Sequence, residues 1–251
     1  MRKLFLMAVA FIALAFASCK KDDPAPNPGT AAKLLKKITQ TEAGATRIYN
    51  LFYDANKRLD SIKSTDGIEL TKLIYDAAGN LISIDEKEED FHNIYVYTYA
   101  NGLPVSATFK SWELHNGQHG DLIEDDELTY TVDAGKVTGI RLDMSDGSWV
   151  NFALTYTNGN LTSVNSVGND FYKASFIYGN KKSPFPQASK FVLDHAGFSL
   201  LLYAKNEIIT TSYDFAGTMF DQTITAQYTY DAAGYPLTSD DGETLLQFEY
   251  Q

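Results

Sequence analysis

The chain of 251 residues has a single cysteine, Cys19. It therefore forms no internal disulfide, and the thiol is either free or modified. The sequence also has no Gly-x-Ser-x-Gly nucleophile elbow, no Walker loop and no dinucleotide-binding fingerprint. We therefore expect no catalytic residue of a motif-defined enzyme class and no cysteine chemistry in the body of the chain. The paired carboxylates of glycoside hydrolases have no fixed spacing in sequence, so this chain is compatible with such a pair.

Basic residues are few, since 21 lysines and arginines face 32 aspartates and glutamates and the formal net charge is −11. A field of this sign favours neither a nucleic-acid partner nor an anionic lipid surface. Long Leu/Ala-rich amphipathic runs are absent, whereas the 16 tyrosines and 15 phenylalanines favour strands. No segment after residue 40 predicts a helix. Residues 31–41 fit either a helical turn or a first strand, and the pattern does not separate the two.

Residues 1–18 have the layout of a secretory signal. Arg2 and Lys3 form a positive start, and residues 4–16 are apolar without a charge. This run is too short for a stable membrane anchor, which makes an N-terminal transmembrane helix the less favoured alternative. Residues 16–19 (FASC) resemble a bacterial lipobox in which Phe16 replaces the usual leucine. The resemblance implies that Cys19 is acylated and becomes the first residue of the mature protein.

Residues 19–32 combine this cysteine with a charged patch, KKDD at 20–23, and a Pro-rich stretch that stays extended as a tether. The patch resembles signals that send Bacteroidetes lipoproteins to the outer face of the outer membrane. We expect a surface-exposed outer-membrane lipoprotein that contacts the membrane only through its lipid anchor; an orientation toward the periplasm is the alternative. Residues 33–251 suffice for one large β domain or two small ones, and we predict a single domain.

A short motif, Tyr-Asp-x-x-Gly-x-Leu, recurs along the chain. Copies read YDANKRL at 53, YDAAGNL at 75, YDFAGTM at 213 and YDAAGYP at 230, with shorter relatives at 99, 132, 156 and 178. A period near 23 residues fits two strands and two turns, so the repeat predicts an antiparallel β-meander of about eighteen strands. Accumulated twist makes sheets above about ten strands curl, split or close. We therefore expect an all-β fold with a strongly curled or closed, barrel-like sheet.

The motif residues match the needs of a tight hairpin, which favours a structural role over a catalytic one. An aspartate at the first turn position can accept a backbone N–H two residues on, and a glycine three residues after it can take a positive φ. The expected turn residues are Asp54, Asp76, Gly79, Gly102, Gly135, Gly159, Gly217, Asp231 and Gly234. In the first copy Lys57 replaces the glycine, which predicts an alternative conformation for that turn.

These residues also define a resemblance to known families. Tyr-Asp-x-x-Gly-Asn/Arg-Leu resembles the YD repeat of RHS-type and teneurin-like proteins. A lipobox followed by degenerate YD units over roughly residues 45–250 is similar to a Bacteroidetes lipoprotein domain of unknown function with a porin-like fold. The resemblance implies a β-meander and implies no activity.

A transmembrane barrel is the rival architecture. It would need an uninterrupted apolar stripe facing lipid on every strand. Charged residues interrupt the predicted strands at Lys63, Lys72, Lys110, Arg141 and Lys173. We therefore expect that the sheet is not a transmembrane barrel.

If all YD-type turns lie at one end of the strands, the remaining connections lie at the other end, because a meander alternates ends. Those connections are acidic, and the longest is expected at 115–127. Insertions on one face of a repeat often mark a binding face, although acidic loops also simply keep a protein soluble. We predict a non-enzymatic binding or scaffold module that recognises a glycan or an envelope protein at this acidic rim. The alternatives are a surface hydrolase with a carboxylate site on the same rim, and a structural spacer.

Two sets of side chains are candidates for this rim. His115, His119, Asp125 and Asp126 could bind Zn²⁺ or Ca²⁺, although Asn116-Gly117 predicts a hairpin and not the helix on which His-x-x-x-His is diagnostic. We expect no resident metal or cofactor. Trp112, Trp149 and Tyr97 could stack on sugar rings, but such aromatics are more often core or cross-strand pairs. His92 and His195 are expected to be ordinary loop residues.

Overall fold

The structure is a computed structural model, and it describes residues 33–168, 171–194 and 198–251. Within these ranges the chain forms one seventeen-stranded antiparallel sheet and a short helix. The signal, Cys19 and the tether lie outside the described residues. The elements are β1 (Leu35–Glu42), β2 (Ala45–Tyr53), β3 (Leu59–Ser64), β4 (Leu70–Tyr75), β5 (Leu81–Lys87), β6 (Phe91–Ala100), β7 (Leu103–His115), β8 (Gln118–Asp133), β9 (Lys136–Asp143), β10 (Trp149–Thr157), β11 (Asn160–Val167), β12 (Lys173–Lys182), α1 (Phe198–Tyr203), β13 (Asn206–Asp214), β14 (Gln222–Thr225), β15 (Gln227–Tyr230), β16 (Pro236–Asp240) and β17 (Thr244–Tyr250).

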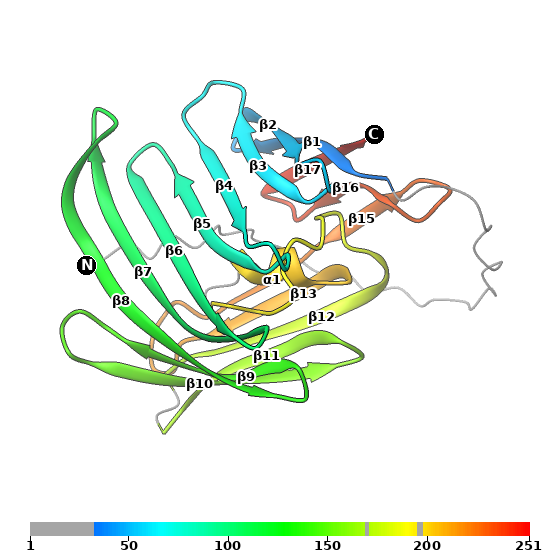
Figure 1. Cartoon of the computed structure of the whole chain (residues 1–251). Helices are drawn as coiled ribbons and strands as arrows, with labels where there is room; N and C mark the ends of the chain where they lie inside the picture. The colour runs from blue at the N-terminus through cyan, green and yellow to red at the C-terminus, as the bar shows by residue number, and fades with distance from the viewer. Residues whose placement is uncertain (1–32, 169–170, 195–197) are drawn as a thin grey trace.

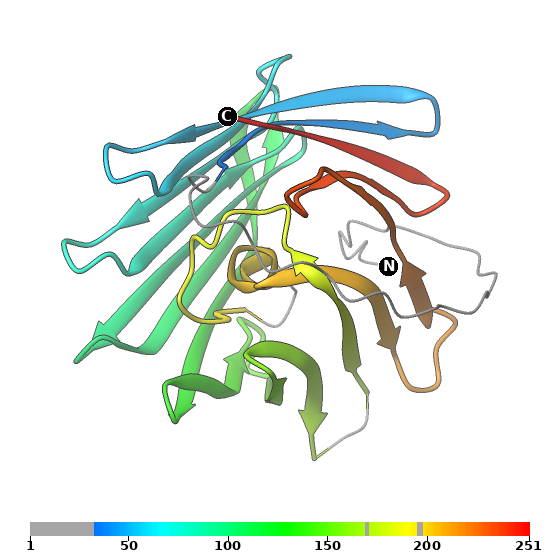
Figure 2. The ribbon, with the colours of Figure 1, turned by 90° about the vertical axis from the view of Figure 1, so that its right-hand side faces the viewer.

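The sheet closes on itself. Consecutive strands pair, and β1 pairs with both the second and the last strand, so that Ile38 lies opposite Tyr49 of β2 and Phe248 of β17. β14 and β15 are two parts of one pass through the sheet, interrupted at Ala226, whose N–H donates to the Ile209 carbonyl at 2.7 Å. Figures 1 and 2 show the strands arranged around a central space. The prediction of an antiparallel meander closed into a barrel-like sheet is confirmed, and residues 35–42 form a strand.

The segment between β12 and β13 fills this central space, and we call its described residues, 183–194 and 198–205, the plug (Figure 2). The Leu193 carbonyl accepts a hydrogen bond from the Tyr130 hydroxyl of β8 at 2.6 Å, and the Phe191 ring lies 6.3 Å from that of Tyr99 in β6. On the opposite side of the barrel, the Phe185 ring packs edge-on against Phe248 of β17. The plug therefore contacts well-separated strands from inside the barrel.

The core of the plug is as buried as any strand, since Leu193 is 0% exposed. It includes the helix α1, so the expectation of no helix after residue 40 is wrong at this point. A wide ring of strands leaves interior volume that strand side chains alone do not fill, and an inserted segment occupies it. None of the helical segments in the described ranges is long and apolar enough to cross a membrane.

The tyrosine of the repeated motif joins neighbouring hairpins. The Tyr75 hydroxyl donates to the Leu59 carbonyl at 2.8 Å, and the Tyr99 hydroxyl donates to the Leu81 carbonyl at 2.9 Å. In both cases the acceptor is the leucine that ends the preceding copy of the motif. The same type of bond joins Tyr53 to Leu35, Tyr156 to Val137, Tyr228 to Ile208 and Tyr250 to Pro236. The motif tyrosines Tyr53, Tyr75, Tyr99 and Tyr156 therefore each tie a hairpin to the previous one, whereas Tyr230 donates to Glu207 instead.

The turns have the expected chemistry. Asp76 Oδ1 accepts the Asn80 N–H at 2.8 Å, and the φ of Gly79 is 77°. The carboxylates of Asp54 and Asp231 likewise accept backbone N–H groups within their own turns. The expected turn glycines, Gly79, Gly102, Gly135, Gly159, Gly217 and Gly234, have φ values between 74° and 85°. Lys57 has a φ of 62° and adopts the left-handed conformation itself, so the expected alternative turn is not formed.

Three details of the repeat prediction are wrong. The motif at 213 lies at the opposite end from the other copies, because the plug occupies the connection between β12 and β13 and the next turn falls at the other end. The motif at 178 is not a turn, since residues 178–182 continue β12. The expected long loop 115–127 is mostly strand: Asn116 and Gly117, with φ values of 53° and 74°, close the hairpin between β7 and β8.

The outer face of the barrel is chemically mixed. Lys63, Lys72 and Arg141 are exposed within their strands, as are the separate apolar residues Phe52 and Ile177. Buried apolar residues alternate with them and face the interior, where they form one continuous core with the plug. The apolar side of the sheet is therefore the inside.

Candidate functional site

The two ends of the barrel differ in charge. We call the end formed by the YD-type turns of residues 53–59, 75–81, 100–103, 133–136, 157–160 and 230–236 the plug end, because the plug enters there. Its cations are Lys33, Lys57, Arg58, Lys136, Lys181, Lys182, Lys190 and Lys205, and they outnumber its carboxylates, Asp54, Asp76, Asp133, Asp231 and Glu207. At the opposite, acidic end lie Glu42, Asp66, Glu69, Glu88, Glu89, Asp90, Asp143, Asp146, Asp214, Asp221, Asp240 and Glu243. The acidic connections thus lie opposite most of the YD-type turns, as expected.

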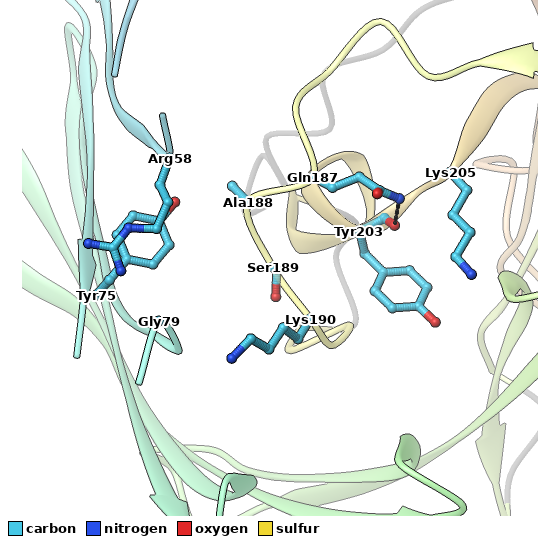
Figure 3. Close-up of a pocket in the computed structure, with 9 residues that line it drawn as sticks. All are labelled: Arg58, Tyr75, Gly79, Gln187, Ala188, Ser189, Lys190, Tyr203 and Lys205. Atoms are coloured by element: carbon cyan, nitrogen blue, oxygen red, sulfur yellow. Dashed lines mark hydrogen bonds between the residues drawn. The ribbon is translucent and has the colours of Figure 1, made fainter. Parts of the chain in front are cut away.

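A cavity of about 410 Å³ lies at the plug end, between the barrel wall and the plug (Figure 3). The wall contributes residues from the first two YD-type turns and from β4, and the plug contributes one stretch before α1 and the residues that end and follow this helix. The lining residues are Arg58, Tyr75, Gly79, Gln187, Ala188, Ser189, Lys190, Tyr203 and Lys205. In Figure 3 the side chain of Lys190 extends from the plug toward the wall.

Three cations line this cavity. Arg58 donates through Nε to Asp54 Oδ2 at 2.7 Å, and its guanidinium carbon lies 4.5 Å from the centre of the Tyr75 ring. The N–H groups of Arg58, first the backbone and then the side chain, lower the pKa of Asp54. This carboxylate therefore remains ionised and holds the guanidinium in place.

The two lysines differ in their surroundings, because Lys190 lies close enough to Asp76 for its charge, after the hydrogen bonds from Asn80, to lower the pKa of that carboxyl group. Lys190 Nζ donates to the Ala78 carbonyl at 3.2 Å and to Asn80 Oδ1 at 3.0 Å. Lys205 Nζ lies over the turn at Gly159, where a Cβ atom would come within 2.8 Å of it. Neither lysine forms an ion pair with a carboxylate of the described residues. The charge of Lys205, and the part of the Lys190 charge that Asp76 does not offset, are therefore available to a ligand in the cavity.

Hydrogen bonds fix the part of the plug that lines the cavity. The Ser189 N–H donates to the Leu202 carbonyl at 3.1 Å, and its hydroxyl donates to the Phe191 carbonyl at 2.6 Å. The Lys205 N–H donates to Asn160 Oδ1 at 3.0 Å, which ties the end of the plug to β11. Burial raises the pKa of Tyr203, so its hydroxyl stays protonated near neutral pH. The cavity is therefore pre-formed.

The histidines expected to form a metal site point to different partners. The side chain of His115 is 64% exposed, and its Nε2 lies 3.6 Å from a carboxylate oxygen of Glu113. His119 instead meets His92, with Nε2 of His119 2.6 Å from Nδ1 of His92. His92 is therefore not an isolated loop residue, and His115 and His119 do not form a pair.

Asp125 and Asp126 face opposite sides of β8. Asp125 pairs with Lys110 of β7 at 2.9 Å on the outer face. Asp126 is buried at 6% exposure and accepts the Ser145 N–H at 3.1 Å. Across the described ranges, no group of three or more His, Cys, Asp or Glu side chains is arranged to hold a metal ion. The structure does not bring the expected Zn²⁺ or Ca²⁺ ligands together.

The three aromatic candidates do not form a platform for a sugar. Tyr97 is 3% exposed and belongs to the interior core. Trp149 is on the outer face, where the Arg141 guanidinium lies 4.5 Å from its ring centre. Trp112 stacks on His119, with the ring centres 4.7 Å apart. Each ring therefore has an intramolecular partner and a location of its own.

The cavity residues Arg58, Lys190 and Lys205 were not predicted from the sequence. One signal was present: the spacing of the repeat becomes irregular between residues 180 and 225, and this interval contains both lysines. An interruption in a regular repeat marks a segment with a different role. Here that segment is the plug.

The geometry defines a class of fold, a closed antiparallel barrel of many short strands with an internal plug. No protein-family model matches the chain, and no curated protein matches it. Among solved structures it is similar to a porin-like protein from Bacteroides uniformis, with a TM-score of 0.51 and 15% identity over 86% of this chain and 96% of the other. It is also similar to a porin-like protein from Bacteroides vulgatus, with a TM-score of 0.55 and 14% identity over 88% and 99% of the two chains. The likeness establishes the porin-like fold that the sequence resemblance implied.

Proposed function

We propose that the protein is a non-enzymatic binding module of the bacterial envelope and that its ligand is an anionic saccharide held in the cavity at the plug end. The observation that supports this most is that Arg58, Lys190 and Lys205 all line one cavity in a chain whose net charge is −11. Cations that line one cavity in a protein of negative net charge favour the binding of an anionic group such as a carboxylate or a sulfate. The proposed site therefore moves from the acidic rim to the plug end.

The size and lining of the cavity support a saccharide. A volume of about 410 Å³ falls within the range of small-molecule sites. Tyr75 and Tyr203 supply ring faces, and Gln187 and Ser189 supply polar groups beside the cations. Aromatic faces with a few placed polar groups suit a ring that has both apolar faces and hydroxyls.

An envelope location is part of the proposal. Its support is the FASC motif at residues 16–19 with KKDD after it, and the structural likeness to two porin-like Bacteroides proteins. Exposed Lys63, Lys72 and Arg141 on the strands favour an outer face in water, which suits a domain tethered by acylated Cys19 at the cell surface. If a Cys19→Ala variant still fractionates with membranes and still incorporates labelled fatty acid, the anchor proposal fails.

A hydrolase at the acidic end is the second candidate, and one observation favours it. Burial, and next the charge of Glu88, raise the pKa of Glu86 to about 7, so this carboxyl group is partly protonated at neutral pH and lies near a second one, Glu88. Such a pair resembles the acid and base of carboxylate-dependent hydrolases. Hydrolysis of an oligosaccharide by the wild type that is lost in Glu86→Gln would favour this function over the binding module.

The binding proposal is tested with charge variants of the cavity. On a glycan array, the purified protein should bind uronate-bearing or sulfated oligosaccharides and not their neutral counterparts. The double variant Lys190→Gln/Lys205→Gln should lose this binding. Lys57→Gln is the matched control, because Lys57 is exposed at the same end but does not line the cavity. Equal binding by the double variant and the control would refute the proposal.

A further inference from the structure

A second cluster of ligand-type side chains lies on the outer face, near the acidic end and away from the cavity. His92 of β6 is opposite Trp112 of β7, and His119 of β8 reaches over the same tryptophan. The His92 and His119 ring centres are 4.9 Å apart, and Trp112 is nearly parallel to His119, at an interplanar angle of 5°. Three neighbouring strands therefore hold two imidazoles on one indole.

The hydrogen bonds determine where the protons lie. Asp85 Oδ1 is 2.8 Å from Nε2 of His92, and an ionised carboxylate can only accept, so Nε2 of His92 is the protonated nitrogen. Nδ1 of a neutral His92 then has a free lone pair, which faces Nε2 of His119 at 2.6 Å. A single proton on His119 Nε2 joins the two rings. The arrangement of a carboxylate, an imidazole and a second electron-pair donor is the one that proteins use around metal ions.

We propose that Nδ1 of His92 and Nε2 of His119 bind a divalent transition-metal ion of the Ni²⁺, Cu²⁺ and Zn²⁺ group, with Asp85 orienting His92 from behind. On binding, the proton between the rings leaves Nε2 of His119 and its Nδ1 takes one up, so the ring stays neutral while both facing lone pairs coordinate the metal. Two imidazoles suit these ions, and water completes the coordination.

The geometry permits this exchange. Metal–nitrogen bonds of about 2.0–2.1 Å place two ligating nitrogens about 3 Å apart. The present separation of 2.6 Å therefore has to widen by about half an ångström, and the two nitrogens, which now face each other, have to turn toward the metal; His119 is exposed and supplies this movement. The neighbouring carboxylates of the acidic end also favour a cation. The site differs from the one expected from the sequence, because His115 takes no part in it.

The fluorescence of Trp112 provides the measurement of metal binding. The chain has two tryptophans, so Trp149→Phe leaves Trp112 as the only indole, stacked on the proposed ligand His119. In this background, Cu²⁺ added at pH 7.5 should quench the fluorescence saturably at one ion per chain. Zn²⁺, which does not quench, should compete and restore the signal. At pH 5 the quenching should weaken, because protonated imidazoles do not bind metals.

Variants assign the ligands. His92→Gln and His119→Gln should each weaken Cu²⁺ binding by more than about tenfold, and Asp85→Asn by about tenfold, the size expected for a group that orients a ligand. His115→Gln is the control and should bind as the parent does. Near-ultraviolet circular dichroism checks that each variant keeps the fold. Quenching that does not saturate, that survives in His92→Gln or His119→Gln, or that is lost in His115→Gln would overturn the site.

Discussion

The tyrosine of the repeated motif is the feature whose energetic role is easiest to isolate, because a Tyr→Phe change removes one oxygen atom and leaves the ring. The Tyr75 hydroxyl donates to the Leu59 carbonyl at 2.8 Å, and Leu59 is 1% exposed. Tyr99 makes the same bond to the buried Leu81 at 2.9 Å. We expect Tyr75→Phe and Tyr99→Phe each to lower the free energy of unfolding.

The magnitude follows from the geometry. A hydrogen bond of this kind contributes about 0.5–1.5 kcal/mol net, and leaving a buried carbonyl without this partner moves the loss toward the upper end. We therefore expect a loss of about 1–1.5 kcal/mol for each variant. Because the rings stay in place, the Arg58 guanidinium keeps its contact with the ring of residue 75.

Tyr97 is the matched control. It lies on β6 two residues before Tyr99 and is 3% exposed, and its hydroxyl has no hydrogen-bond partner among the described residues. Removing a buried hydroxyl without a partner relieves a desolvation penalty. Tyr97→Phe should therefore leave the free energy of unfolding unchanged or raise it by up to about 1 kcal/mol.

Urea unfolding of the four proteins gives the comparison, read as changes in midpoint at a constant slope. The account requires Tyr75→Phe and Tyr99→Phe to unfold at lower urea than the wild type, and Tyr97→Phe at equal or higher urea. If Tyr97→Phe is destabilised as much as the other two, loss of the inter-hairpin hydrogen bond does not explain the effect, and the reasoning is refuted.

Three further predictions concern stability and are measured by urea unfolding. Burial, and next the charge of Glu88, raise the pKa of Glu86 from 4.5 to about 7. The contribution of this group to the free energy of unfolding is therefore greatest below about pH 4.5 and falls as the pH rises to about 7. Glu86→Gln should remove this fall and, since partial exposure reduces the effect, raise stability at pH 8 by about 1–2 kcal/mol; an unchanged pH profile would contradict this. Gly79→Val should lower stability by about 1–3 kcal/mol through strain at its φ of 77°, and unfolding without ligand is the measurement because Gly79 also lines the cavity. Gly179→Ala should cost at least as much, because its Cβ would clash with the carboxylate of the buried Glu207; a smaller loss than in Gly79→Val would argue against this close contact.

The hairpins could be predicted from the sequence because turn chemistry is local. Asp76 and Gly79 are three residues apart. The carboxylate of Asp76 accepts a backbone N–H of the turn and Gly79 takes the positive φ, so the turn forms from neighbouring residues alone. Closure into a barrel followed from the number of strands and their twist. The ties made by the tyrosine hydroxyls were not anticipated, because each joins two hairpins and depends on their register.

The plug could not be predicted, since its stability comes from contacts that are distant in sequence. Phe191 packs on Tyr99, and Leu193 accepts a hydrogen bond from Tyr130. The plug also changes which end the next turn occupies, and this is why the motif at 213 was placed at the wrong end. The cavity depends on the same contacts, because Arg58 and Lys190 meet only when the plug lies against the first hairpins.

Hydrogen exchange with and without a bound uronate-bearing or sulfated oligosaccharide tests whether the ligand binds at the plug end. The account predicts that the ligand slows amide exchange in residues 76–80, 187–190 and 203–205, which surround the cavity. Residues 85–93 and 115–127 at the acidic end should exchange at unchanged rates. Protection confined to those acidic segments would contradict the account and return the binding site to the acidic end.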